Sequence, residues 1–128
     1  MIEEQFVSFE TARMLKEAGF DEPCSFCYSP CKDIRRKNYK RNSDLVKGYS
    51  RPTQALAARW LREVHRISVD AAFMAPSTNI DVWQYFIGNM DDMIWPGDFE
   101  TSERTYATYE EAMEAGLQEA IKLIKSED

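Results

Sequence analysis

Three cysteines in the first quarter of the chain have the most specific spacing for chemistry. Cys24, Cys27 and Cys31 follow the pattern Cys-x2-Cys-x3-Cys, and His65 is the single histidine. Three thiolates and one imidazole would complete a tetrahedral zinc site. The second spacing is irregular, and a strand would place Cys24 and Cys27 on opposite faces. The alternative is that the cysteines are small buried apolar side chains. We therefore expect no cofactor, with zinc as the alternative.

A basic segment follows the cysteines. Residues 32–66 hold eleven basic and three acidic side chains, a net charge of +8, whereas the whole chain carries −6 and the remainder therefore −14. Tyr39 and Tyr49 lie among the cations, and such a mixture can follow a phosphate backbone and stack on bases. The alternative is a solvated segment balanced by acidic helices, since the acidic chain has no recognised nucleic-acid motif. The candidates for binding a nucleic acid or an acidic partner are Arg35, Arg36, Lys37, Lys40, Arg41, Arg51, Arg59 and Arg62.

The usual catalytic motifs are missing from the sequence. It contains no Gly-rich phosphate loop, no Gly-x-Ser-x-Gly elbow and no His-Glu-x-x-His motif. A Cys–His pair can be drawn from any chain with three cysteines and one histidine, so that pairing carries no argument for catalysis. We expect a protein that is not an enzyme.

The composition is typical of one globular domain. The chain has 128 residues, 44% of them apolar and 30% charged, enough to bury a core without disulfides or metal. No run of 18 apolar residues is present, so we expect no membrane helix. The first residues, Met1–Gln5, are acidic and lack the apolar stretch of a signal peptide. We therefore expect a cytoplasmic protein with reduced cysteines.

Three helices are expected to position these residues. The first runs from Phe9 to about Ala18, with Ser8 as its N-cap and Gly19 just beyond its end. The second begins near Pro52 and carries an apolar stripe that ends near His65. The third begins after the cap Thr108, and the predicted helices cover residues 9–18, 52–65 and 109–125.

The strand pattern predicts a hairpin. Residues 67–75 alternate apolar and polar side chains, residues 80–87 are rich in β-formers, and turn residues lie between the two runs. Short strands are predicted at Ser25–Ser29 and near Arg104–Ala107. The remaining stretches, 31–50 and 88–102, are predicted loops, the first of them basic and flexible. The sequence thus predicts one α+β domain over residues 1–128, with a small antiparallel sheet led by the 67–75/80–87 hairpin and packed by about three helices.

Three stretches of the chain carry a resemblance. They are Val7–Ala12 (VSFETA), Arg51–His65 (RPTQALAARWLREVH) and Thr108–Ala120 (TYEEAMEAGLQEA). In this order they resemble a family of small uncharacterised proteins from gut-bacterial phages and prophages. The resemblance implies an accessory protein of a phage or mobile element in the cytoplasm of its bacterial host, and it brings no catalytic residues.

Together these features predict a non-enzymatic binding or interaction module. Its partner is expected to be a protein or a nucleic acid, without a membrane, and a homo-oligomer is compatible with the sequence. Two alternatives remain open at this point. The first is a nucleic-acid-binding protein that uses the basic segment 32–66, and the second is a small module stabilised by zinc on the cysteines.

Overall fold

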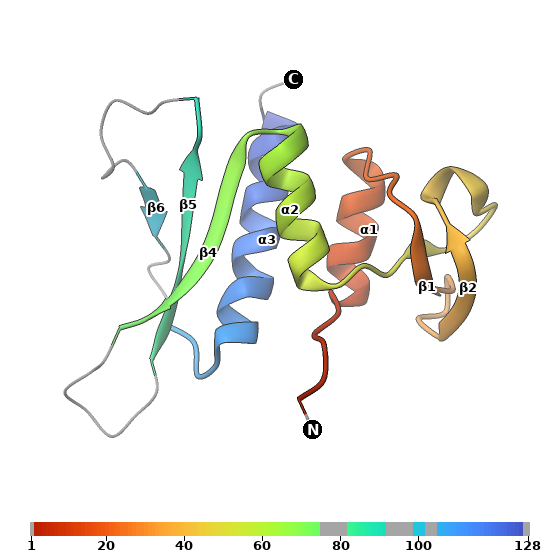
Figure 1. The fold of residues 1–128 in the computed structure, drawn as a ribbon, viewed down its shortest axis with the longest axis horizontal. Helices are drawn as coiled ribbons and strands as arrows, with labels where there is room; N and C mark the ends of the chain where they lie inside the picture. Colours follow the sequence, from red (N-terminus) through yellow and green to blue (C-terminus); the bar gives the residue numbers. More distant parts are fainter. Residues whose placement is uncertain (1, 75–81, 92–98, 102–104, 127–128) are drawn as a thin grey trace. The chain divides into compact units, whose positions relative to one another are not determined.

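The described part of the chain forms two compact units, each containing helix and strand (Figure 1). The computed structural model describes residues 2–74, 82–91, 99–101 and 105–126. The N-terminal unit comprises residues 1–57 and the C-terminal unit residues 58–128, so the boundary falls within helix α2 (Gln54–Val64). Each unit holds a small antiparallel sheet. The predicted α+β class is confirmed, with the strands in two sheets instead of one.

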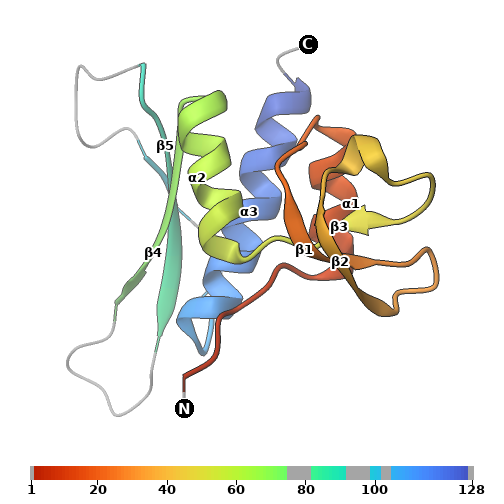
Figure 2. The same cartoon turned by 45° about the vertical axis from the view of Figure 1, so that its right-hand side comes forward.

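The N-terminal unit contains one complete helix and a three-stranded sheet. Its elements are α1 (Phe9–Glu17), β1 (Cys24–Tyr28), β2 (Ile34–Lys40), the short 3-10 helix η1 (Asn42–Asp44) and β3 (Tyr49–Ser50). The strand order is β2-β1-β3 with antiparallel pairing, so β2 is an edge strand. Figure 2 shows these strands as the orange and yellow ribbons beside α1. The Phe9 ring of α1 lies edge-on against Tyr28 and Tyr49, with ring centroids 5.7 and 5.4 Å apart.

Helix α1 begins and ends where its sequence predicts. Ser8 accepts a hydrogen bond from the backbone N–H of Thr11, as an N-cap should. Gly19 has a φ of +97°, and the N–H of Phe20 donates to the carbonyl of Leu15 at 2.9 Å. This is the Schellman ending that glycine favours. It turns Phe20 into the core, where 1% of its surface is exposed.

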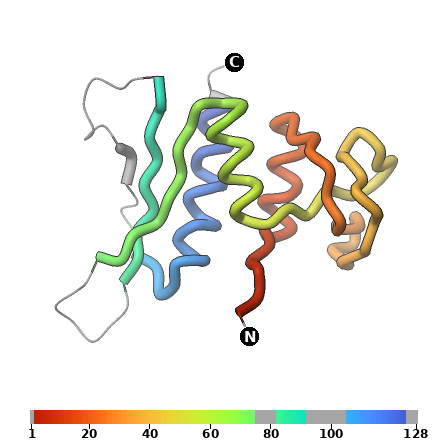
Figure 3. Tube along the Cα trace, viewed as in Figure 1, coloured from red at the N-terminus to blue at the C-terminus, as the bar shows by residue number. Residues whose placement is uncertain are grey.

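The prediction of a loop over residues 31–50 was wrong for strand β2. The strand has seven consecutive exposed residues, so it lacks the alternation that makes a half-buried strand readable from sequence. Backbone pairing with β1 forms it instead, and Ser29 and Asp33 close the connecting turn through a 2.8 Å backbone hydrogen bond. The Cα trace in Figure 3 follows the chain from β2 back to β3.

The C-terminal unit contains the predicted hairpin. Strand β4 (Ile67–Phe73) pairs with β5 (Trp83–Asn89) in antiparallel register, from Ile67 opposite Asn89 to Phe73 opposite Trp83. The predicted turn between them lies outside the described residues. Strand β6 (Phe99–Thr101) completes the order β4-β5-β6 within the stretch predicted as a loop. Near the predicted third strand, Tyr106 forms an isolated bridge with Trp83.

Helix α3 (Tyr109–Ser126) packs on β4 and β5 through its apolar stripe. Gly116 sits at the closest approach, since a Cβ there would lie 2.8 Å from the Cβ of Tyr85 and 3.1 Å from Cγ1 of Val69. Met113 and Leu117 flank it and are almost completely buried. The absence of a side chain at Gly116 thus sets how close this helix lies to its sheet.

Two further sequence predictions can be compared with the structure. Helix α2 was predicted to begin near Pro52 and begins at Gln54. Thr53 caps it, because its hydroxyl accepts a hydrogen bond from the N–H of Leu56 at 3.1 Å. Among the described helices, none combines the length and the apolar character needed to cross a membrane.

Candidate functional site

Strand β2 presents four of the eight predicted cationic side chains. Arg35, Arg36, Lys37 and Lys40 all lie on this edge strand and are exposed, and Tyr39 between them is 74% exposed. These five residues are called the basic strand surface. Arg35 has an ion partner in Asp33 at 3.9 Å, a long pair between exposed groups that contributes little to stability. The basic strand surface is therefore available to a partner.

A bulge near the end of β2 changes the direction of its side chains. Arg36 lies opposite Phe26, yet Lys40 lies opposite Cys24, so four residues of β2 span only two of β1. Tyr39 within this stretch has a φ of +47°, a conformation that is uncommon outside glycine. Such irregularities re-aim side chains at the edge of a sheet. Here Lys40 lines the same cavity as Arg35 and Lys37, whereas Tyr39 lines a smaller, separate one.

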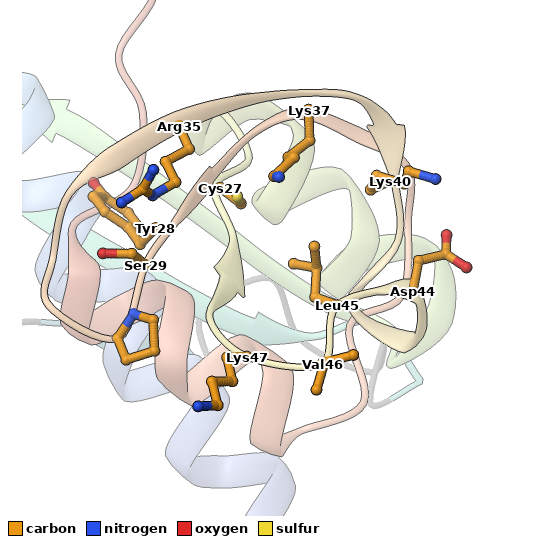
Figure 4. A pocket seen from close by; sticks show the side chains of 11 residues that line it. Cys27, Tyr28, Ser29, Arg35, Lys37, Lys40, Asp44, Leu45, Val46 and Lys47 are labelled. Carbon is orange, nitrogen blue, oxygen red and sulfur yellow. The ribbon is translucent and has the colours of Figure 1, made fainter.

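The larger cavity has a volume of about 390 Å³ and opens beside β2. Figure 4 shows Arg35, Lys37 and Lys40 along one side, with Leu45 and Val46 on the facing loop. The rest of its wall comes from residues 27–30, Asp44 and Lys47. This space is called the β2 cavity. It lies wholly within the N-terminal unit.

The charges that line the β2 cavity are mainly positive. Four cations meet one carboxylate, that of Asp44, which already accepts a hydrogen bond from the backbone N–H of Arg41 at 3.0 Å. Within the described part of the chain, Lys37, Lys40 and Lys47 form no salt bridge. The cavity therefore favours an anion, and a negatively charged ligand would meet cations that have no competing partner.

Asn42 fixes the turn that carries the loop back over β2. Its side chain is 5% exposed, and it donates to the carbonyl of Phe20 at 2.7 Å and accepts from the N–H of Ser50 at 2.8 Å. Asp21 holds the same turn from outside, because its carboxylate accepts from the backbone N–H and the hydroxyl of Ser43. The backbone hydrogen bond from Ser43 lowers the pKa of Asp21 below its usual value.

Gly48 closes the loop against β1. Its φ is +93°, and a Cβ at this position would lie 2.4 Å from the backbone oxygen of Tyr28. The ammonium of Lys16 on α1 donates to the Gly48 carbonyl at 2.9 Å. Only glycine combines this dihedral angle with this close approach. The glycine thus keeps residues 45–47 in place along the β2 cavity.

Two of the predicted binding residues have partners inside the N-terminal unit. The Arg51 guanidinium lies 4.1 Å from the centroid of the Phe6 ring and donates to the Tyr28 hydroxyl at 3.2 Å. The Arg41 guanidinium donates to the carbonyl of Asp21 at 2.7 Å. These contacts make Arg41 and Arg51 parts of the scaffold that supports the sheet.

The remaining two predicted cations lie in the C-terminal unit. Arg59 and Arg62 are exposed on α2, and Arg59 pairs with Glu63 one turn later at 3.0 Å. Since they belong to the other compact unit, the structure does not join them to the basic strand surface.

The candidate zinc ligands are spread over different surroundings. Cys24 and Cys27 are buried on β1, where Cys24 lines the smaller cavity and Cys27 the β2 cavity, and Cys31 is exposed. His65 belongs to the C-terminal unit, with its ring edge-on to Trp60 at a centroid distance of 4.7 Å. Burial raises the pKa of Cys24 to about 11, which favours the neutral thiol. Within the described ranges, no three acidic, cysteine or histidine side chains are grouped to hold a metal. Zinc remains a hypothesis for metal analysis of the purified protein.

Sequence reasoning missed the loop side of the β2 cavity. Lys47 was counted with the basic segment but not among the candidate residues, and Leu45 and Val46 had no assigned role. The signal was present in Asn42-Ser43-Asp44 and Gly48, which are turn-forming types. If these residues had been interpreted as two turns, the sequence would have predicted that residues 45–47 return to the side of the basic residues.

The chain was compared with known proteins by family, by sequence and by structure. No family model, no curated protein and no solved structure matches it. The chemistry of its own residues is therefore the basis for a functional proposal.

Proposed function

We propose that this protein is a non-enzymatic binding module whose N-terminal unit holds a single-stranded nucleic acid on the basic strand surface. The observation that carries the proposal is the exposed edge strand β2, which presents Arg35, Arg36, Lys37 and Lys40 beside Tyr39. Cations follow the phosphates and an exposed ring stacks on a base, a combination common in proteins that bind single strands.

The distribution of charge supports a local binding site. The N-terminal unit has ten basic and eight acidic side chains, a net charge of +2, whereas the C-terminal unit has six basic and fourteen acidic ones, a net charge of −8. Phosphates are the dominant attraction in nucleic-acid binding, and they would be repelled by the acidic unit. The binding surface is therefore confined to the N-terminal unit.

An exposed aromatic ring favours nucleic acid over an acidic protein as the partner. Tyr39 is 74% exposed although a tyrosine normally buries its ring. It stands between Lys37 and Lys40 in the sequence and lines the smaller cavity, so a strand that crosses β2 would meet the cations and then the ring. An acidic peptide would use the cations but would have no need of the ring. Together with the resemblance to phage and prophage proteins, this supports a role as an accessory protein of a phage or mobile element that binds nucleic acid.

Fluorescence anisotropy with labelled single-stranded DNA and RNA at several salt concentrations tests the proposal. We expect a dissociation constant of about 10⁻⁴–10⁻⁶ M near physiological salt, and affinity that falls as salt rises. The variant Arg36→Gln/Lys37→Gln removes two phosphate contacts, so the slope of log K against log salt should decrease in magnitude by about 1.4. Tyr39→Ala should weaken binding further, by about 1–3 kcal/mol, at all salt concentrations.

A matched control separates a local site from general attraction. The variant Arg13→Gln/Lys122→Gln loses the same charge, but Arg13 pairs with Glu10 and Glu17 on α1 and Lys122 pairs with Glu119 on α3. This control should bind like the unmodified protein. Equal weakening in both double variants, or binding weaker than about 10⁻⁴ M, would show that the basic strand surface is not the site.

A further inference from the structure

The β2 cavity combines two kinds of surface that single-strand binding along β2 does not require. Its rim carries Arg35, Lys37, Lys40 and Lys47, and its loop side carries Leu45 and Val46. Leu45 is partly exposed and Val46 is 96% exposed, so both apolar side chains are open to a ligand. A ligand that fits both surfaces has a multiply charged anionic end and an apolar or aromatic body.

We infer that the β2 cavity is a nucleotide-binding pocket, which takes the phosphate of one nucleotide against its lysines and the nucleoside against Leu45 and Val46. This inference rests on the proposed binding of a nucleic-acid strand and names the unit that the cavity selects, which is a nucleotide with a terminal phosphate, free or at the phosphorylated end of that strand. The volume of about 390 Å³ lies in the usual range for small-molecule sites, well above what a bare phosphate needs.

Charge number favours phosphate over carboxylate as the anionic end. A carboxylate carries one charge and is matched by one cation, whereas a terminal phosphate carries about −1.5 to −2 near neutral pH and has three acceptor oxygens. The β2 cavity offers four cations against one carboxylate that is already hydrogen-bonded. Lys37 lines the cavity from the strand and Lys47 lines it from the loop, so both parts of the wall contribute positive charge.

Amide NMR of the full chain tests the inference with adenosine 5′-monophosphate, adenosine and inorganic phosphate as probes. We expect the nucleotide to bind saturably and to shift amides of residues 27–30, 35–40 and 44–47. Phosphate alone and adenosine alone should each bind about tenfold more weakly or worse, because each fills one of the two surfaces. No saturable shift at about 10 mM nucleotide would overturn the inference.

Three glutamine variants separate the cavity from the open strand. Lys37→Gln and Lys47→Gln each remove a cation from the rim, and nucleotide affinity should fall about tenfold in each, since a charge-assisted hydrogen bond is lost. Arg36→Gln is the control, because Arg36 lies next to Lys37 on the same strand but does not line the cavity. All three side chains are exposed, so the fold should be retained. Equal effects of Arg36→Gln and Lys37→Gln would overturn the inference.

The remaining outcomes distinguish this inference from the proposed function. If a 5′-phosphorylated single-stranded oligonucleotide binds and Lys47→Gln leaves its affinity unchanged, the nucleotide pocket is wrong while binding along β2 stands. If inorganic phosphate binds as tightly as the nucleotide, the cavity is a simple anion site. Displacement of the nucleotide by a ten-residue glutamate peptide at equal concentration would assign the cavity to an acidic protein instead. If neither oligonucleotide nor nucleotide binds, both proposals fail.

Discussion

The two units of this chain each contain a helix and a three-stranded sheet, but different interactions hold them together. In the C-terminal unit, alternating residues of β4 such as Val69 face a helix whose Gly116 allows close packing, so apolar contact defines the unit. In the N-terminal unit, polar groups hold the chain between β2 and β3, with Asn42, Asp21 and Gly48 each making specific backbone contacts. One unit is organised by burial and the other, around its cavity, by hydrogen bonds.

This difference teaches where a binding surface can form. A strand that is held by its neighbour's backbone and by turns needs no apolar face of its own, so all seven residues of β2 are exposed. Charged side chains on this strand therefore do not replace any apolar side chain of the hydrophobic core. In the C-terminal unit, by contrast, Ile67, Val69 and Ala71 on β4 are buried, so alternate positions of that strand must stay apolar.

The largest effect on this contrast is expected from Gly48→Ala. The new Cβ would meet the Tyr28 carbonyl at 2.4 Å in a backbone conformation that strains any other residue. We expect a loss of about 3 kcal/mol in unfolding free energy, from the dihedral strain and the forced shift of the loop. Denaturant unfolding measures the loss, and amide exchange should accelerate first in residues 26–50.

Gly19→Ala is the matched control for that variant. Gly19 has a similar φ of +97°, but a Cβ there would meet no atom within 4 Å. It should cost only the dihedral strain, about 1–2 kcal/mol. An equal loss in both variants would mean that close approach to β1 does not fix the loop.

Asn42→Ala is expected to have the next largest effect. It leaves the carbonyl of Phe20 and the N–H of Ser50 without the partner that the structure gives them in a buried site. The expected loss is about 2 kcal/mol, the usual cost of an unsatisfied buried polar group. Affinity for the oligonucleotide should fall too, because the turn positions the cavity loop. Asn42→Ala with unchanged stability would contradict the view that hydrogen bonds organise this unit.

Gly116→Val tests the other half of the comparison. A side chain at Gly116 must push against Tyr85 and Val69, and overpacking of this kind costs about 1–3 kcal/mol. Oligonucleotide binding should be unaffected, since the change lies in the C-terminal unit. A variant that is more stable than the unmodified protein, as helix propensity alone would give, would show that α3 does not pack this closely.

The smallest effect concerns Asp21 and pH. The hydrogen bonds from Ser43 lower the pKa of Asp21 in the folded protein below the usual 3.8. A lowered carboxyl pKa stabilises the fold above its unfolded value, and the contribution disappears as pH falls through the folded value. Asp21→Asn should therefore remove part of the stability loss seen on acidification below about pH 4. Thermal unfolding from pH 2.5 to 7 measures it, and superimposable pH profiles would argue against this contact.

Burial decided which parts of the fold could be predicted. Helix α1 and the β4–β5 hairpin were correct because capping residues and alternation follow from a buried face, as at Leu15 and Val69. Strand β2 was missed because it buries no side chain, and its pairing with the preceding strand β1 is made by backbone groups that every sequence carries. Four of the cationic candidates were placed together by that strand, while Lys47 joined them through a turn fixed by the φ of Gly48. Burial requires apolar residues at regular spacing, which the sequence reveals. Backbone pairing and turn geometry restrict fewer residue types, so they are harder to predict from the sequence.

The most direct test is to map a bound strand on the full chain by amide NMR, with an unlabelled eight-nucleotide single-stranded DNA added in steps. We predict that the largest shifts fall on residues 34–47, with small changes across α3. The largest shifts at Arg59, Arg62 or along α3 would contradict the assignment of binding to the basic strand surface of the N-terminal unit.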